Sequence, residues 1–131
     1  MASQPDYRVL FDPFHIQNDT FGRYRFKMLL SEAPDTYEDF DGCTFKGNLL
    51  QGDAVILQCN TANGRMGLIT GSEATQFEIA DNEGFWWEVE KADAEVLVVG
   101  KYKYDIEVTY SDGVVRTRVY GTLTVKIDRS E

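Results

Sequence analysis

The sequence predicts an all-β domain, and two observations support this prediction. Residues 101–127 contain two stretches in which apolar and polar residues alternate, and this period of two is typical of half-buried strands. Upstream, turn-forming residues separate short β-prone stretches at the spacing typical of a β-sandwich or barrel. The chain has 131 residues, of which 43% are hydrophobic, so we expect residues 1–131 to form a single domain with its own core.

The elements before the final hairpin are predicted in chain order. Residues 1–17 carry apolar side chains but are interrupted by Pro5 and Pro13, so we expect either an edge strand or an arm that packs on a neighbour. Strands are then expected at residues 22–30, 43–49, 55–59, 66–69, 76–79 and 85–89, which with the hairpin makes about 7–9 strands. Residues 90–97 favour helix but are short, so we expect one helical crossover there.

The clearest strand pattern belongs to a C-terminal hairpin between Tyr102 and Ile127. A two-residue type I′ turn at Asp112-Gly113 would bring the apolar faces of its two strands together. The resulting apolar pairs are Tyr102–Leu123, Ile106–Val119 and Tyr110–Val115. A three-residue loop would place apolar faces against polar ones, so we predict the two-residue turn.

The same register makes two further predictions about side chains. Glu107 lies opposite Arg118 on the outer face, where the two form a favourable cross-strand charge pair. Gly121 lies opposite Tyr104, whose ring can cover the bare glycine.

The charge of the chain argues against several classes of partner. Lys and Arg number 13 against 22 Asp and Glu, a formal charge of −9, which repels nucleic-acid phosphates and anionic membrane surfaces. No apolar run approaches the roughly 20 residues of a membrane helix, and the N-terminus lacks the features of a signal peptide. Without an export signal, we expect Cys43 and Cys59 to be buried reduced thiols rather than a disulfide.

The side chains that carry catalytic or metal chemistry are too few or badly spaced. Residues 39–42 resemble part of a calcium loop, but the first and twelfth loop positions are not carboxylates, so we expect a solvated acidic turn. Two cysteines and the single His15 cannot make a four-ligand zinc site, and no nucleophile elbow is present. We therefore expect no enzyme activity, no metal and no cofactor.

Candidate contact residues come from three places in the sequence. They are the N-terminal apolar residues, one of two adjacent tryptophans, and a basic stripe that meets either an acidic neighbour or an acidic face of the same domain: Tyr7, Leu10, Phe11, Phe14, Trp86, Trp87, Arg23, Arg25 and Lys27. Adjacent strand residues point to opposite faces, so one tryptophan belongs in the core and the other faces an edge, a partner or a ligand. A sugar-binding platform is an alternative use of the outer ring.

The hairpin also carries a family resemblance. Residues 100–108 read G-K-Y-K-Y-D-I-E-V, which resembles the G-x-Y-x-Y-D-[LI]-E-[LV] stretch of small bacteriophage virion domains. Gly121–Val125 is similar to the G-x-[LV]-x-V segment that follows in that family, and Asn18–Phe21 and Phe40–Phe45 resemble two earlier landmarks. The family is the immunoglobulin-like N-terminal domain of phage baseplate upper proteins, together with stand-alone phage proteins of similar pattern.

This resemblance implies an immunoglobulin-like β-sandwich that acts as a virion structural protein. It would be a tail or baseplate component or a fibre-attachment adaptor, assembled as a homo-oligomer with other virion proteins in the host cytoplasm. Two alternatives stay open, a head decoration protein that binds the capsid and a carbohydrate-binding module.

Overall fold

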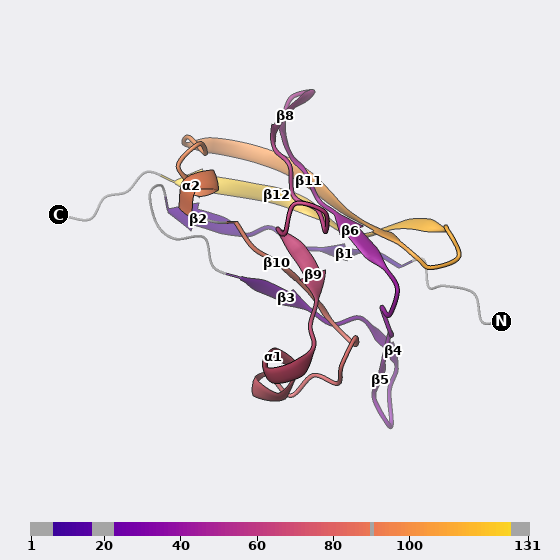
Figure 1. Ribbon diagram of the computed structural model, residues 1–131. Helices are drawn as coiled ribbons and strands as arrows, with labels where there is room; N and C mark the ends of the chain where they lie inside the picture. The colour runs from indigo at the N-terminus through magenta and orange to yellow at the C-terminus, as the bar shows by residue number, and fades with distance from the viewer. Residues whose placement is uncertain (1–6, 17–22, 90, 127–131) are drawn as a thin grey trace.

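The computed structural model describes residues 7–16, 23–89 and 91–126, and these form two facing β-sheets (Figure 1). The larger sheet contains β1 (Val9–Leu10), β2 (Phe14–Ile16), β6 (Thr44–Lys46), β7 (Leu49–Gln51), β8 (Ala54–Leu57), β11 (Gly100–Thr109) and β12 (Val115–Lys126). The smaller sheet contains β3 (Tyr24–Phe26), β9 (Met66–Leu68) and β10 (Phe85–Trp87). The predicted β-sandwich is therefore confirmed. The landmark Asn18–Phe21 lies outside the described residues.

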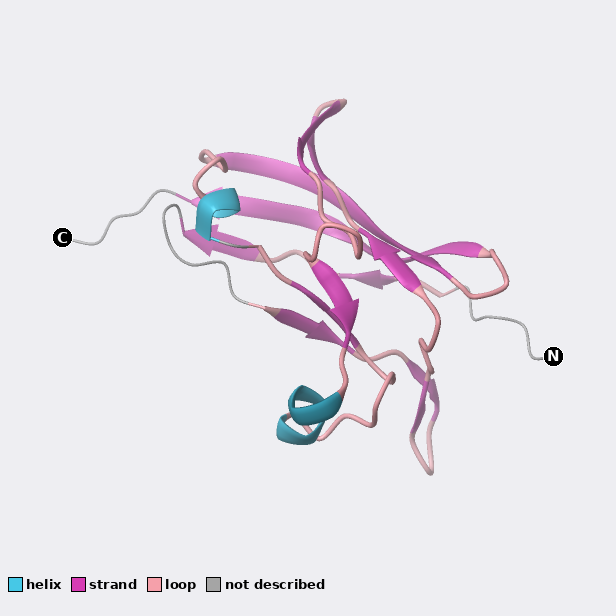
Figure 2. Cartoon of the chain, in the orientation of Figure 1, coloured by secondary structure: helices cyan, strands magenta, loops and turns pink. Residues whose placement is uncertain are grey.

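Four further elements lie outside the two sheets (Figure 2). Strands β4 (Leu29–Ser31) and β5 (Thr36–Tyr37) form a separate hairpin at the end of the molecule that also holds α1 (Gly71–Gln76). Helix α2 (Lys91–Ala94) precedes β11, which confirms the predicted crossover. Among the residues that the structure describes, no helix is long and apolar enough to cross a membrane.

The large sheet is built around β11 and β12, its longest strands. Its order is β1-β12-β11-β7-β8, with β2 also on β12 and β6 also on β11. The pairs within the sheet are antiparallel except at the N-terminal edge, where β1 and β2 run parallel to β12. The described part of residues 1–17 is thus an edge strand of the domain's own sheet.

The core lies between the two sheets and is rich in aromatic rings. Phe85 of the small sheet stacks on Phe45 of the large sheet, with ring centroids 4.7 Å apart. Trp87 lies beside Tyr104 across the same gap, at 4.9 Å. These four rings are almost completely buried. Ring pairs at such distances add to the free energy of burial, so the sheets are held together by aromatic contacts at their centre.

The hairpin register is confirmed in one half of the strands and wrong in the other. Tyr102 pairs with Leu123, Tyr104 with Gly121 and Ile106 with Val119, as predicted. Beyond Ile106 the register shifts by one residue, so that Glu107 pairs with Thr117 instead of Arg118, and Thr109 instead of Tyr110 pairs with Val115.

Two features of the turn region explain the shift. The loop has three residues, because the Tyr110 N–H donates to the Val114 carbonyl at 2.8 Å and Gly113 adopts a φ of 92°. Arg118 is then an extra residue in β12, a β-bulge. From the bulge to the far end of the hairpin, the apolar faces of β11 and β12 again lie opposite each other. A three-residue loop therefore does not cause the mismatch of apolar and polar faces that favoured a two-residue turn.

Gly121 lies opposite Tyr104, as predicted, and the N-terminal backbone also packs against it. A Cβ at this position would lie 1.9 Å from the carbonyl oxygen of Phe11 and 2.8 Å from Oδ1 of Asp12. The hydroxyl of Tyr104 donates a hydrogen bond to the same Phe11 carbonyl. The glycine is therefore needed for close approach of the N-terminal backbone, and Tyr104 holds that backbone in place.

The strand predicted at residues 76–79 does not form. Helix α1 ends at Gln76 and a turn follows it at residues 77–78. The Ile79 N–H donates to the Ala74 carbonyl at 2.9 Å, as in a helix C-terminus. Ile69, Ala74 and Ile79 form a second, small core against which Trp86 packs. Alternation over only four residues did not distinguish a strand from the end of a helix.

Candidate functional site

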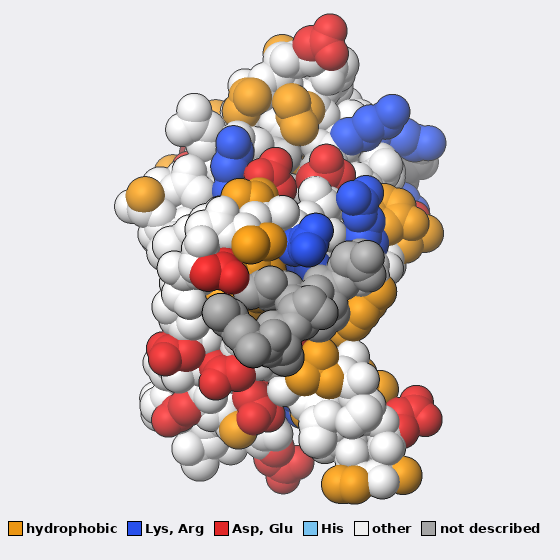
Figure 3. Space-filling view, turned by 90° about the vertical axis from the view of Figure 1, so that its right-hand side faces the viewer, with side chains coloured by type: hydrophobic (Ala, Val, Ile, Leu, Met, Phe, Trp, Pro, Cys, Tyr) orange, Lys and Arg blue, Asp and Glu red, His pale blue; other side chains and the backbone are white. Residues whose placement is uncertain are grey.

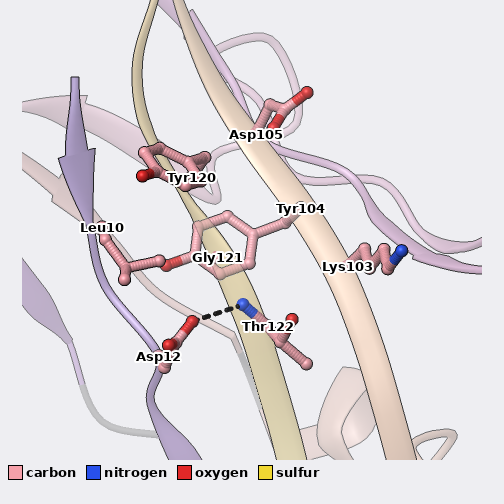
Figure 4. Close-up of a pocket in the computed structure, with 8 residues that line it drawn as sticks. All are labelled: Leu10, Asp12, Lys103, Tyr104, Asp105, Tyr120, Gly121 and Thr122. Carbon is pink, nitrogen blue, oxygen red and sulfur yellow. Dashed lines mark hydrogen bonds between the residues drawn. The ribbon is translucent and has the colours of Figure 1, made fainter. Parts of the chain in front are cut away.

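The N-terminal segment follows the edge of β12 with a kink at residues 11–13. The Phe11 N–H donates to the Tyr120 carbonyl at 2.9 Å, and the Thr124 N–H donates to the Pro13 carbonyl at 3.0 Å. Between them, the carboxylate of Asp12 accepts the Thr122 N–H at 2.9 Å (Figure 4). The carboxylate takes the place of a backbone carbonyl, so the strand changes course without leaving an unpaired N–H in the sheet.

The four predicted contact residues of this segment have different surroundings. Leu10 and Phe14 are exposed, at 58% and 61% of their surface. Phe11 instead points into the core, where its ring meets Tyr24 edge-on at 5.1 Å. Tyr7 is partly covered by the rest of the domain, and its hydroxyl donates a hydrogen bond to a backbone carbonyl of β4 at 2.9 Å. Only Leu10 and Phe14 therefore offer a largely free apolar surface.

A buried charged cluster lies beneath this segment, at the bulge of β12. Nη1 of Arg118 donates to Glu38 at 2.5 Å and to the hydroxyl of Tyr110 at 2.6 Å, and that hydroxyl donates to the other oxygen of Glu38. Nε of Arg118 donates to the Tyr7 carbonyl at 3.0 Å, and the guanidinium lies 4.7 Å from the Tyr7 ring centroid. The cluster thus anchors the N-terminal segment to the sandwich.

Burial and charge act in opposite directions within the cluster. Burial acts to lower the pKa of Arg118, but the hydrogen bond and charge of Glu38 outweigh it, so that the pKa is raised. Burial, together with the hydrogen bond to Glu38, raises the pKa of Tyr110. The arginine is therefore held charged and the phenol neutral. Alternation along β12 gave no sign of this cluster, because it assigned Arg118 to the outer face.

The basic stripe of β3 meets acidic groups of the same domain. Nη1 of Arg23 lies 2.6 Å from Glu73 and its Nε lies 3.2 Å from Glu88. Nε of Arg25 lies 2.7 Å from the other oxygen of Glu73. In Figure 3 the acidic side chains crowd the lower part of the view, at the end that holds α1. Of the two alternatives for this stripe, the structure shows an acidic face of the same domain.

Lys27 and the two tryptophans complete the predicted contact residues. Nζ of Lys27 lies 3.7 Å from the ring centroid of Tyr37. Trp87 is fully buried in the main core, whereas Trp86 faces outward from the small sheet and is half-buried. The guanidinium of Arg23 lies 3.9 Å from the Trp86 ring centroid, so one face of that ring is covered within the domain.

The two cysteines and the single histidine are buried. Cys43 and Cys59 are free thiols, and burial raises the pKa of each to about 11. His15 is 6% exposed. Asp39 accepts the Asp41 N–H at 2.9 Å, an Asx turn of the kind expected for a solvated acidic loop. Among the described residues, no group of three or more His, Cys, Asp and Glu side chains is placed to hold a metal ion.

The outer face of the large sheet is hollowed on both sides of Asp105. One hollow, of about 330 Å³, lies over β1, β12 and β11 and is lined by Leu10, Tyr120 and Lys103 among others (Figure 4). A second, of about 270 Å³, lies toward β7 and β8 and includes Val55. Both are shallow and open to solvent.

Comparisons with known proteins add a fold likeness only. No established protein family matches the sequence, and no curated protein matches it. Among solved structures the chain is similar to CopC from Methylosinus trichosporium OB3b, with 11% sequence identity and a TM-score of 0.43. The alignment covers 92% of this chain and 88% of that chain. At this score the likeness carries no argument about function, and the β-sandwich rests on the strand pairing described above.

Proposed function

We propose that the chain is a bacteriophage virion structural protein of the tail or baseplate, which attaches fibres or neighbouring subunits by protein–protein contacts. The resemblance of residues 100–108 to small virion domains carries this proposal. The proposal includes an immunoglobulin-like arrangement of the sandwich and assembly as a homo-oligomer.

The geometry of the motif supports the proposal. Residues 100–108 form almost all of β11, the central strand of the large sheet. The apolar members of the motif, Tyr102, Tyr104, Ile106 and Val108, are buried in the core. Its charged members alternate with them and face outward. One face of the motif therefore packs in the core, and the other presents a charged surface to solvent. This arrangement is compatible with a module that assembles with other proteins.

Exposed apolar side chains at the margins of the sandwich also support a role in assembly. Those at least half exposed are Leu10, Phe14, Leu30, Val96, Val98, Val99 and Val115. They lie on the N-terminal edge strand, the β4–β5 hairpin, the loop before β11 and the start of β12. Apolar side chains gathered at edges are typical of contact surfaces, since their burial against a partner is favourable.

The proposal is tested by locating the protein in phage particles. The phage that encodes the chain is grown with an epitope tag on this protein, and purified particles are imaged with gold-labelled antibody. Label at the tail or baseplate is the expected result, and loss of tail structures in a deletion mutant would support it further. Label on the head would favour the capsid decoration alternative. Particles that form normally and carry no label would refute a virion role.

A further inference from the structure

The outer face of β11 carries an ordered set of charges. Lys101, Lys103, Asp105 and Glu107 occupy alternate positions, so two cations are followed by two anions on one face of one strand. The three nearest the start of the strand are exposed and Glu107 is half exposed. Figure 4 shows Lys103 and Asp105 leaving the strand on the side opposite the buried Tyr104.

Among the described residues, none of these four side chains forms an ion pair or a side-chain hydrogen bond, although Lys46 of β6 lies opposite Glu107 in the sheet. The ion pairs that the structure shows are formed by arginines, namely Arg23 and Arg25 at α1, Arg65 with Asp93, and Arg118 at the bulge. None of the four outward charges of β11 takes part in these ion pairs or in a side-chain hydrogen bond of the described chain. The outward charges of β11 are therefore available to a partner.

The charge order is complementary to itself when one strand is reversed. Two copies can place the outer faces of their large sheets against each other. The two-fold axis that relates them then lies between these two outer faces, at right angles to the strands and level with Tyr104. Strand β11 of one copy then runs antiparallel to β11 of the other. Lys101 faces Glu107 of the second copy and Lys103 faces its Asp105, and the symmetry makes each contact twice. A parallel alignment would instead bring like charges together.

We propose that the chain forms a symmetric dimer through the outer faces of its large sheet, with these four ion pairs at the centre. The shallow hollows on each side of Asp105 receive side chains of the second copy. Leu10, Tyr120 and Val55, which are 58%, 41% and 48% exposed, lie on the margins of the same face and are covered by the partner. Facing sheets pack about 10 Å apart, a gap that opposed lysine and carboxylate side chains can span.

This inference gives a geometry to the homo-oligomer that the proposed function includes, but its test does not depend on the virion role. The dimer is measured on the purified protein alone, and the virion role is measured on particles. A monomeric protein found in the tail would refute the dimer only, and a dimeric protein absent from particles would refute the virion role only.

The first measurement is the mass of the purified chain by sedimentation velocity, over a range of concentrations and salt. We expect a species of twice 14.9 kDa that dissociates more readily as salt is raised. Screening shortens the reach of a charge from about 10 Å at 0.1 M salt to about 3 Å at 1 M, so exposed ion pairs weaken. A chain that stays monomeric at low salt up to about 1 mM would overturn the proposal.

Charge reversal then tests the register. K103E and D105K each turn two of the four ion pairs into repulsive contacts, so each variant alone should dimerise about tenfold to a hundredfold more weakly. Mixed in equal amounts, the two variants should form a heterodimer, because one central contact is then the original ion pair and the other is an ion pair with its charges exchanged. The double variant K103E/D105K should also dimerise like the original chain.

The matched control is D53K, which makes the same charge change in the exposed turn between β7 and β8. Mixing K103E with D53K gives the same total charge as the rescuing mixture but should not restore the dimer. The proposed register would be overturned if D53K restored the dimer of K103E. It would also be overturned if the mixture of K103E and D105K showed no species heavier than either variant alone. Circular dichroism checks that each variant keeps the fold, since only exposed side chains are changed.

Discussion

Replacing Gly121 by Ala should destabilise the protein, although strand preferences alone predict the opposite. In an ordinary strand, alanine in place of glycine gains about 0.5–1 kcal/mol, because the unfolded chain loses conformational freedom. Here the new Cβ would lie 1.9 Å from the carbonyl oxygen of Phe11, far inside the 3.0 Å below which something must shift. The N-terminal backbone would therefore have to move by more than about 1 Å, judged from hydrogen-bond and contact geometry.

That movement has a calculable cost. It breaks the hydrogen bond from Tyr104 to the Phe11 carbonyl and displaces the Phe11 ring from the core. A lost buried hydrogen bond costs about 1–3 kcal/mol, and overpacking costs about 1–3 kcal/mol. After the gain from alanine is subtracted, we expect the free energy of unfolding of Gly121→Ala to fall by about 1–5 kcal/mol.

The assay is urea unfolding followed by tryptophan fluorescence, since Trp87 is fully buried. A double-mutant cycle with Phe11→Ala supplies the control, because that change loosens the same segment independently. If the clash is with the N-terminal backbone, Gly121→Ala should cost clearly less when Phe11 is already replaced. A stabilised Gly121→Ala, or an equal cost in both backgrounds, would refute the reasoning.

Three further predictions concern buried groups. Glu38→Gln leaves Arg118 buried without a counter-charge and should lower the free energy of unfolding by about 3 kcal/mol, measured by urea unfolding. Glu38→Leu/Arg118→Met should cost less, and an equal or larger cost would contradict this account. Cys43 and Cys59 should resist a thiol reagent at pH 8 until urea is added, because both are buried and protonated. Rapid native modification of either would be inconsistent with the structure. The unfolded thiols lose their protons near the ordinary cysteine pKa of 9.0, whereas the folded ones have a pKa of about 11, so the unfolding free energy should fall as pH rises through this window. The loss is at most about 3 kcal/mol per thiol, and replacing both cysteines by alanine should flatten the pH dependence. An unchanged slope would assign it to other groups.

Alternation predicted well those features that depend on which face of a strand is apolar. The pairs of Tyr102, Tyr104 and Ile106 follow from the match of two apolar faces, and a slip by one residue would have exposed all of them. The short helix before β11 followed from local composition. These features are encoded within a few residues of where they appear.

The features that sequence missed depend on partners far along the chain. Arg118 leaves the predicted register because its carboxylate partner, Glu38, lies 80 residues away and inside the sandwich. The three-residue turn is compatible with the apolar faces only because this bulge adds a residue to β12. Likewise, Arg25 of the basic stripe meets Glu73, 48 residues later, in a helix that the pattern did not predict. Alternation predicts the face of the strand on which a residue lies, but not which residue of a distant segment packs against it.

The interpretation of the N-terminal residues was correct in part for the same reason. Their apolar character indicated burial or contact, and Phe11 is buried while Leu10 and Phe14 are exposed. The sequence left open whether the segment packs on a neighbour or forms an edge strand, because both uses need the same side chains. The role of the segment in assembly stays a prediction.

The parallel pairing of the first strands with the last one has a consequence for the order of folding. Asp12 and Thr122 are 110 residues apart, so the large sheet cannot be completed until β12 has left the ribosome. Contacts at such separation close late and slow the reaction, because the entropy of a long loop must first be lost. Until then the edge of β12 has open backbone groups that can pair with another chain. Pairing of β12 with the N-terminal strands of its own chain therefore competes with pairing to another chain. The faster of the two decides whether the subunit folds correctly or misassembles, which matters most for a protein made in many copies at once.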